Sequence, residues 1–268
     1  QLANSLPNYE GYIIPDNYGN LTLAYLVKQN VEVVNHMSIY TSSSYNTMFA
    51  GRPPYLIQLI HNGTTYYLIN VHFKCCGDGT LNTSDYTDEE YRRLQASNQI
   101  KTYIDSYLPD ENVIVLGDYN DLLEEGESNN VFQSIIDDSE NYLFADMLIA
   151  QQTSSNWSFP SWPSHLDHIL ITNELIDDFN NSYNNVQTIL MDNYFSNGFY
   201  GYDNCISDHR PVAIKLFQTP SNVEEENKAP SKLKGIRDIQ GRKTLPQSNN
   251  LQFYYYENGT VEKHFIIN

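Results

Sequence analysis

Four short polar motifs, each at one end of an apolar segment typical of a strand, constrain the fold of this chain more than any other feature. They are Asn70-Val71-His72, Gly117-Asp118-Tyr119-Asn120, His165-Leu166-Asp167-His168 and Ser207-Asp208-His209-Arg210-Pro211. A strand end is a rigid place to hold a charged side chain over a cleft. Four polar motifs at four strand ends are hard to explain as four unrelated turns. We therefore expect these strand ends to meet at one site.

The second and fourth motifs carry residue types that hold a divalent cation or a phosphate. A short apolar run ends at Gly117, and Asp118 and Asn120 then alternate, so their side chains can point the same way. Oxygen groups of this kind suit a hard cation such as Mg²⁺ or Mn²⁺. Asp208 beside His209 adds a second carboxylate and a group that titrates near neutrality.

In order and chemistry the motifs resemble those of the endonuclease/exonuclease/phosphatase superfamily, the fold of pancreatic deoxyribonuclease, abasic-site endonucleases, neutral sphingomyelinases and inositol-polyphosphate phosphatases. The resemblance runs from about Gln1 to Phe217, and its most specific parts are Gly-Asp-x-Asn and Ser-Asp-His-Arg-Pro. It implies a phosphoric ester hydrolase that uses Mg²⁺ or Mn²⁺ on a phosphodiester. The expected fold is a four-layer α/β sandwich of two packed mixed β-sheets flanked by helices.

The resemblance also implies catalytic roles. His72 is expected to donate to the phosphate or the leaving group. Asp118 and Asn120 are expected to position the attacking water and the phosphate. Asp167 is expected to orient His209, which acts as the general base or as a phosphate stabiliser.

The same resemblance implies that Asp208 binds the metal. Arg92 and Arg93 lie on one predicted helix, where either could reach a phosphate, although most such arginines pair with acidic neighbours. A proline-rich loop carries Trp157 and Trp162, which either stack on substrate or pin the loop to the core. The candidate substrate contacts are Asn70, Arg92, Trp162 and His165.

Two features of the resembled family do not occur in this sequence. One is an early strand with a metal-side Asn, and the other is a strand that ends in Gln-Glu, the main metal-binding carboxylate. The chain starts Gln1-Leu-Ala-Asn-Ser without Met, which resembles the helix that follows the Gln-Glu strand. We therefore expect the first two strands, and any signal peptide, to precede Gln1.

The formal net charge of −18 limits the partners of the chain. The first 220 residues carry 8 basic and 27 acidic residues. Such a domain lacks the basic footprint of a tight nucleic-acid binder, which argues against sequence-specific DNA reading. A metal and a few cations at the cleft could still hold a phosphate. No apolar run is long enough to span a membrane, and we expect a monomer.

Three cysteines, Cys75, Cys76 and Cys205, lie near the predicted strand ends. If those ends meet at one cleft, Cys205 could form a disulfide with one of the adjacent pair in an oxidising compartment. Three free thiols are the alternative. Zinc is not expected, because no second Cys or His pair has the spacing of a zinc site.

Hydrophobic periodicity predicts the regular elements of the first domain. Asn62-Gly63 is a strong hairpin signal. A capping box of Thr87 and Glu90 predicts the start of a helix that Pro109 stops, and 131–136 is a second, shorter helix. Strands are predicted at 21–28, 31–40, 54–61, 65–71, 112–116, 168–172 and 212–217.

The composition changes after the first domain, which we place at residues 1–217. Residues 218–231 are typical of a linker, and 232–268 carry three short strand patterns with an Asn258-Gly259 turn. This last part resembles the C-terminal sorting domain of type IX secretion, with Asp238-Ile-Gln-Gly-Arg242 as its marker. A small β extension of the enzyme is the alternative. The resemblance implies export, with the type IX secretion machinery as partner.

Three functions remain open at this point. The first is a secreted nuclease or phosphodiesterase that acts on extracellular nucleic acid. The second is a phosphatase or a sphingomyelinase-like lipid phosphodiesterase of the same fold, which the acidic surface favours over a DNA enzyme. The third is an inactive surface binding module, against which the presence of all four motifs argues.

Overall fold

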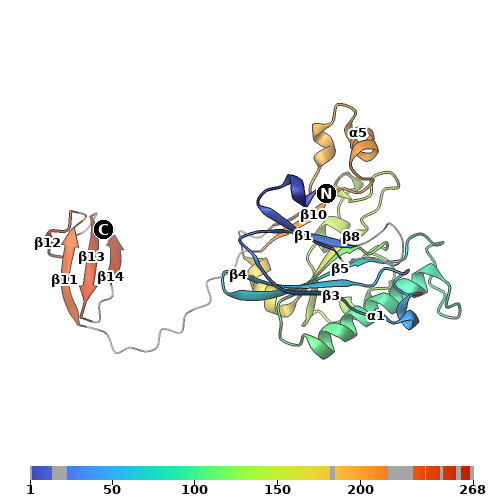
Figure 1. Cartoon of the computed structure of the whole chain (residues 1–268), viewed down its shortest axis with the longest axis horizontal. Coiled ribbons are helices and arrows are strands. Elements are labelled where there is room, and N and C mark those ends of the chain that lie inside the picture. The colour runs from blue at the N-terminus through green and yellow to red at the C-terminus, as the bar shows by residue number, and fades with distance from the viewer. Residues whose placement is uncertain are drawn as a thin grey trace. The chain divides into compact units, whose positions relative to one another are not determined.

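The computed structural model describes residues 2–13, 23–181, 185–216, 232–238, 240–247, 250–257 and 261–265. The chain divides into two units, Gln1–Phe217 and Gln218–Asn268, and each has its own sheet (Figure 1). The linker expected at 218–231 lies outside the described residues.

The centre of the first unit is a mixed six-stranded sheet with the order β3-β4-β5-β6-β8-β7. Only the β5–β6 pair is parallel. Asn62 and Gly63 join β4 to β5 with φ of 50° and 82°, the left-handed pair that a two-residue hairpin requires, so this prediction is confirmed. The strands are β3 (Glu32–Ser38), β4 (Tyr55–His61), β5 (Thr64–His72), β6 (Val113–Asp118), β7 (Tyr142–Phe144) and β8 (Asp167–Thr172).

Both faces of this sheet are buried. Val113 and Val115 of β6 belong to one apolar core, and Ile114 between them belongs to the other, because successive side chains of a strand point to opposite faces. The first core contains Ala96, Ile100 and Ile104 of the long helix α1 (Glu89–Tyr107). The second core contains Val186, Val212 and Ile214 of β9 (Asn185–Thr188) and β10 (Val212–Lys215).

The second layer of strands consists, within the described residues, of two antiparallel pairs, β9–β10 and β1 (Tyr9–Ile13) with β2 (Ala24–Lys28). Tyr25 attaches β2 to the central sheet, since its hydroxyl lies 2.7 Å from the Tyr55 carbonyl and 2.9 Å from that of Leu68. The mixed α/β sandwich expected from the sequence is thereby confirmed.

Short helices complete the first unit, and no described helix is both long and apolar enough to cross a membrane. Their bounds are η1 (Ala3–Ser5), η2 (Ser43–Tyr45), α2 (Gln133–Ile136), α3 (Met147–Ala150), η3 (Ser154–Asn156), η4 (Asn173–Leu175), α4 (Ile176–Asn180), η5 (Met191–Tyr194) and α5 (Gly198–Cys205).

The start of α1 corrects the predicted capping box. Asp88, not Thr87, is the N-cap, and its side chain accepts a hydrogen bond from the backbone N–H of Tyr91 at 2.7 Å. Glu90 does not reach back to the cap, because its carboxylate turns inward and is only 1% exposed. The Asp88 carboxylate, one residue later, thus replaces the Thr87 hydroxyl as the hydrogen-bond acceptor that caps the helix.

Gly117 explains why a glycine begins the Gly-Asp-x-Asn motif. Its φ is +142°, and a Cβ at this position would lie 1.9 Å from the carbonyl oxygen of Val71 on β5. Only glycine allows the two backbones to approach this closely. The approach fixes the parallel register that places His72 directly beside Asp118.

The second unit is an antiparallel sheet with the order β12-β11-β13-β14. Asp238 forms the turn after β11, accepting hydrogen bonds at Oδ1 from the Gln240 and Arg242 backbone and at Oδ2 from the Arg242 guanidinium. The Asp-x-x-Gly-Arg motif is therefore a self-bonded turn, while Asn258-Gly259 lies outside the described residues. The strands are β11 (Leu233–Asp238), β12 (Lys243–Thr244), β13 (Leu251–Tyr256) and β14 (Val261–Phe265).

Candidate active site

Strand register brings three of the four motifs to one edge of the central sheet. His72 at the end of β5 pairs with Asp118 at the end of β6, and Asp118 pairs with Asp167 at the start of β8. The fourth motif follows α5 and delivers His209 to the same place, with its Nδ1 2.6 Å from Asp167 Oδ2. The convergence expected from the sequence is present.

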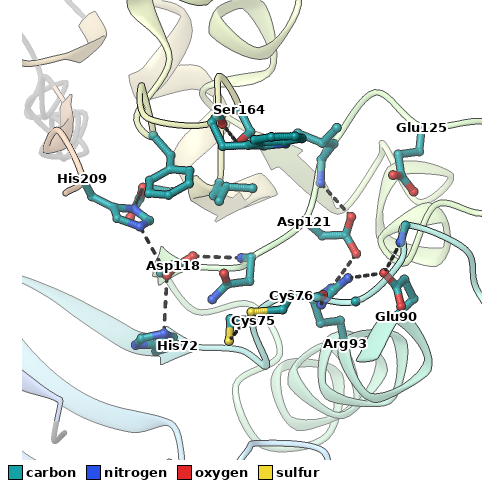
Figure 2. A pocket seen from close by; sticks show the side chains of 18 of the residues that line it. His72, Cys75, Cys76, Glu90, Arg93, Asp118, Asp121, Glu125, Ser164 and His209 are labelled. Carbon is teal, nitrogen blue, oxygen red and sulfur yellow. Dashed lines mark hydrogen bonds and ion pairs between the residues drawn. The ribbon is translucent and has the colours of Figure 1, made fainter. Parts of the chain in front are cut away.

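Asp118 lies between two imidazole rings (Figure 2). Its Oδ2 is 3.4 Å from His72 Nε2 and 4.0 Å from His209 Nε2. The carboxylate is held by the backbone N–H of Asn120, which donates to Oδ1 at 2.9 Å. Asn120 is itself fixed, because its Nδ2 donates to the Phe73 carbonyl at 3.2 Å.

The two histidines have opposite electrostatic environments. Burial alone would lower the pKa of His209, but the hydrogen bond and the charge of Asp167 outweigh it and raise this pKa to about 9. Burial, helped by the charges of Arg52 and His209, lowers the pKa of His72 to about 4. Burial and the charge of Asp167 raise the pKa of Asp118 to about 6. At neutral pH the site therefore holds a cationic His209 and a neutral His72.

These residues open into a cleft of about 680 Å³ that also contains Asp208. Phe159 lies against His209 with ring centroids 4.8 Å apart. Trp162 lines the cleft and is 79% exposed, whereas Trp157 donates from Nε1 to the Ile149 carbonyl at 3.2 Å. One tryptophan of the loop therefore pins it and the other faces the cleft.

Three predicted substrate contacts are placed elsewhere, which corrects those expectations. His165 is 1% exposed, so it cannot reach a substrate. Asn70 donates to the Ala24 carbonyl at 3.2 Å and Arg92 to the Thr47 carbonyl at 2.7 Å, and neither lines the cleft. Because successive residues of a helix point in different directions, the neighbouring Arg93 lies in the cleft wall instead.

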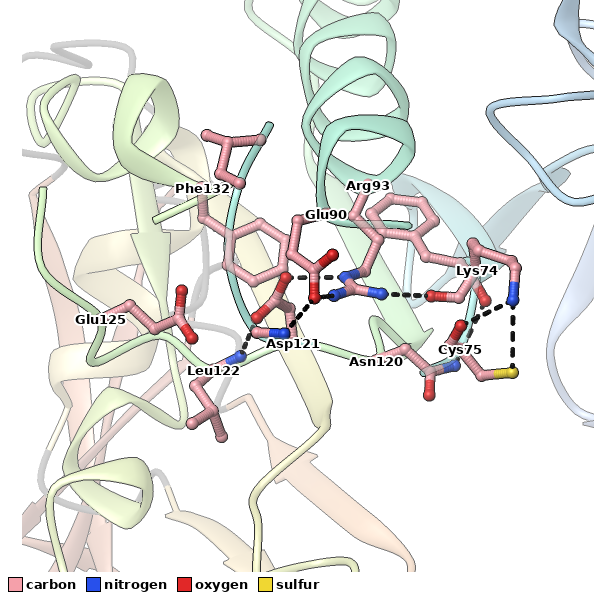
Figure 3. Close-up of polar contacts among 12 residues, drawn as sticks. Lys74, Cys75, Glu90, Arg93, Asn120, Asp121, Leu122, Glu125 and Phe132 are labelled. Carbon is pink, nitrogen blue, oxygen red and sulfur yellow. Dashed lines mark hydrogen bonds and ion pairs between the residues drawn. The ribbon is translucent and has the colours of Figure 1, made fainter. Parts of the chain in front are cut away.

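Arg93 organises the cleft wall near Asn120 (Figure 3). It is 3% exposed and donates to Asp121 Oδ2 at 2.7 Å, with Glu90 Oε1 3.0 Å away. The same guanidinium donates to the carbonyls of Lys74 and Cys76, each at 2.8 Å. In the sequence, Arg92 and Arg93 are equal candidates for a residue of the cleft. Only the burial of one face of α1 distinguishes them.

A buried network lies behind Asp167. His168 Nδ1 is 2.6 Å from Asp146 Oδ2, and its Nε2 is 2.9 Å from the Asp121 carbonyl. Because both partners are acceptors, both ring nitrogens must carry protons, and His168 is a buried imidazolium. His165 Nε2 contacts the same Asp146 oxygen at 3.0 Å. The motif around Asp167 is thus anchored from below by Asp146.

This pair predicts a bell-shaped contribution to stability. Burial would raise the pKa of Asp146, but the charge of His168 outweighs burial and depresses this pKa in the folded protein. The stability that ionised Asp146 contributes is therefore lost as the pH falls from about 3.9 through the pKa of the folded state. Burial would lower the pKa of His168, but the charge of Asp146 outweighs burial and raises this pKa in the folded protein. The stability that protonated His168 contributes is therefore lost as the pH rises from about 6.5 through the pKa of the folded state.

Asp146→Asn is therefore expected to lower the free energy of unfolding by about 1–3 kcal/mol between pH 4 and 6.5, and by less on either side. Urea unfolding of wild type and variant from pH 3 to 9 measures the difference. A constant difference across this range would contradict the assignment of His168 as a cation.

The cysteines form no disulfide in the structure. All three are free, and Cys75 and Cys76 place their sulfur atoms 2.9 Å apart on the cleft wall. Cys205 is exposed at the end of α5. Of the two alternatives that the sequence left open, the structure therefore has three free thiols.

The donor set fits a hard divalent cation. Asp118, Asp167 and His209 have ligand-type atoms within 4.8 Å of one another, and of these only the two carboxylates can bind a cation, because His209 is protonated. The exposed carboxylate of Asp208 lines the same cleft, and no hydrogen bond to it is found in the described part of the chain. Carboxylate oxygens of this kind are the ligands that Mg²⁺ and Mn²⁺ prefer.

Comparison with known proteins agrees with the fold described above. A family model described as "Endonuclease/Exonuclease/phosphatase family" matches residues 7–209. A solved structure of zebrafish (D. rerio) TDP2 complexed with single-strand DNA product is 14% identical, with a TM-score of 0.56, covering 79% of this chain and 78% of that one. The Bacteroides thetaiotaomicron mannosyl-6-phosphatase Bt3783 is 14% identical, with a TM-score of 0.50, covering 81% and 79%. No curated protein matches the sequence significantly.

Proposed function

We propose, from the premise that this chain belongs to the endonuclease/exonuclease/phosphatase family, that it is a metal-dependent phosphodiesterase that acts outside the cell. Members of the family are phosphoric ester hydrolases that use divalent metal ions. The observation that carries the proposal is the convergence of His72, Asp118, Asp167 and His209 at one cleft, with His209 Nδ1 2.6 Å from Asp167 Oδ2 and both imidazoles facing Asp118.

Each side chain then has a distinct task. A divalent ion, Mg²⁺ or Mn²⁺, held by Asp208 would neutralise the charge of the phosphate. Asp118, with its Oδ1 fixed by Asn120, orients the attacking water. His209 stabilises the negative charge that develops on the phosphoryl oxygens, because Asp167 keeps it protonated. His72 hydrogen-bonds the phosphate or the leaving oxygen.

Export is supported by the second unit. The motif that resembles the type IX sorting signal forms a turn on a separate sheet, in which Asp238 Oδ2 and Arg242 Nε bond each other at 2.8 Å. We infer that this unit addresses the enzyme to the type IX machinery and takes no part in catalysis. The substrate is then an extracellular phosphodiester, with nucleic acid the first candidate.

A phosphomonoester of a small molecule is the second candidate, and the cleft wall favours it. Glu90, Asp121 and Glu125 line the cleft beside one guanidinium, that of Arg93. Burial and the charge of Asp121 raise the pKa of Glu125 to about 6. An acidic wall repels the flanking phosphates of a polynucleotide but tolerates an uncharged leaving group.

The test is a parallel assay of bis-p-nitrophenyl phosphate, p-nitrophenyl phosphate and plasmid DNA, with Mg²⁺, Mn²⁺ or EDTA. The protein is expressed with any sequence that its gene places before Gln1. Metal-dependent cleavage of the diester or nicking of the plasmid is expected. Cleavage of the monoester alone would favour the second candidate, and no turnover of any of the three would overturn the enzymatic assignment.

A further inference from the structure

The loop between β5 and α1 gathers acidic side chains away from the catalytic histidines. Asp78, Asp88 and Glu90 each offer a carboxylate oxygen, and these oxygens lie within 4.8 Å of one another. None of the three belongs to the catalytic set. The chain carries a net charge of −18, so a cluster of three carboxylates adds to an already unfavourable repulsion unless a cation offsets it.

The three carboxylates share one arrangement. Each uses one oxygen to accept hydrogen bonds from the backbone of the loop or of α1, and within the described residues these bonds all end on Asp78 Oδ1, Asp88 Oδ1 and Glu90 Oε1. The backbone bonds run from Thr80 N to Asp78 Oδ1 (2.9 Å), from Tyr91 N to Asp88 Oδ1 (2.7 Å) and from Gly79 N to Glu90 Oε1 (2.8 Å).

Glu90 supplies the strongest indication that this group of carboxylates binds a cation. It is 1% exposed, and its buried Oε2 has no hydrogen-bond partner within the described residues. Leaving such an oxygen unsatisfied is costly. The loop packs closely over this carboxylate, because a Cβ at Gly77 would lie 2.4 Å from its Oε1.

Arg93 does not supply the missing charge. Its guanidinium is 3.0 Å from Glu90 Oε1 and is shared with Asp121, to which its Nε donates at 2.7 Å. One fixed cation therefore serves two buried carboxylates, and Asp78 and Asp88 add two more negative charges next to them. The local excess is best balanced by a doubly charged ion.

We propose that Asp78, Asp88 and Glu90 bind a Ca²⁺ ion, separate from the catalytic metal. Ca²⁺ takes six to eight oxygen ligands at roughly 2.4 Å, so it can join oxygens up to about 4.8 Å apart and complete its shell with loop carbonyls and water. Mg²⁺ requires a tighter octahedral set. The ion fixes the loop whose Gly77 and Gly79 line the catalytic cleft.

Calcium binding is measured by thermal unfolding of the protein after EDTA treatment, with Ca²⁺ or Mg²⁺ added back. Ca²⁺ at about 100 times its Kd is expected to raise Tm by roughly 5–10 °C, and Mg²⁺ by less. Tb³⁺ luminescence excited through tyrosine, with Tyr86 and Tyr91 beside the loop, gives a direct binding readout. Neither readout depends on catalytic activity.

Variants identify the ligands. Asp78→Asn and the double variant Asp78→Asn/Asp88→Asn keep the amide oxygens that accept the loop hydrogen bonds, so both are expected to fold without Ca²⁺. They should lose the Ca²⁺-induced Tm shift and the Tb³⁺ signal. Asp85→Asn is the matched control, because Asp85 accepts from Thr87 in the same loop and lies outside the group. No Ca²⁺ shift in wild type, or an equal shift in the double variant, would overturn the proposal.

Discussion

Replacing His209 with alanine is expected to lower kcat/KM for phosphoester hydrolysis by about 10²–10⁴ without unfolding the protein. His209 Nε2 lies 4.0 Å from Asp118 Oδ2, and the positive charge of this side chain depends on the 2.6 Å hydrogen bond with Asp167. Steady-state kinetics with bis-p-nitrophenyl phosphate measures the loss, and the urea unfolding midpoint shows whether the fold is kept.

A double-mutant cycle separates this role from a structural one. Asp167→Asn keeps the shape of the side chain but no longer holds a proton on His209, so its loss should approach that of His209→Ala. The double variant should be little slower than either single variant, because the two residues act as one unit. Additive losses would show that Asp167 and His209 contribute independently.

Replacing Arg93 with methionine is expected to cost about 3–5 kcal/mol of the free energy of unfolding. The guanidinium is 3% exposed, and its removal leaves Glu90 and Asp121 buried without their cation. It also frees the carbonyls of Lys74 and Cys76 from their donor. Urea unfolding in EDTA measures the effect without bound metal.

Arg92→Met is the matched control for this substitution. Arg92 is the preceding residue on α1, and its Nε makes one exposed hydrogen bond to the Thr47 carbonyl at 2.7 Å. Its replacement should cost less than about 1 kcal/mol. Similar losses for the two variants would mean that the buried network around Arg93 contributes little.

The fold and the position of the candidate site could be predicted from the sequence because both are encoded locally. The Asn62-Gly63 turn, the alternation in β6 and the polar residues at strand ends depend on neighbours within a few positions. Strand register then brings His72, Asp118 and Asp167 together. The protonation states of the site are not local, because they depend on burial and on charges from distant segments.

The errors have the same physical origin. His165 belongs to a polar motif, yet its partner Asp146 is 19 residues away and buries it. Thr87 and Glu90 fit a capping box, but Glu90 is buried beside Arg93, and Asp88 caps the helix by accepting from the Tyr91 N–H. Arg92 and Arg93 are indistinguishable until the packing of α1 buries one of them. Each error concerns a side chain whose environment is set by tertiary contacts.

The two tryptophans differ in exposure, so the intrinsic fluorescence of the protein can report on ligand binding. Trp162 is 79% exposed at the cleft, while Trp157 is fixed by its hydrogen bond to Ile149, and the chain contains no third indole. Occupancy of the cleft should alter the emission and the quencher accessibility of Trp162, with Trp157 as an internal reference. Ligand screening can therefore proceed by intrinsic fluorescence, before any substrate is known and without a label.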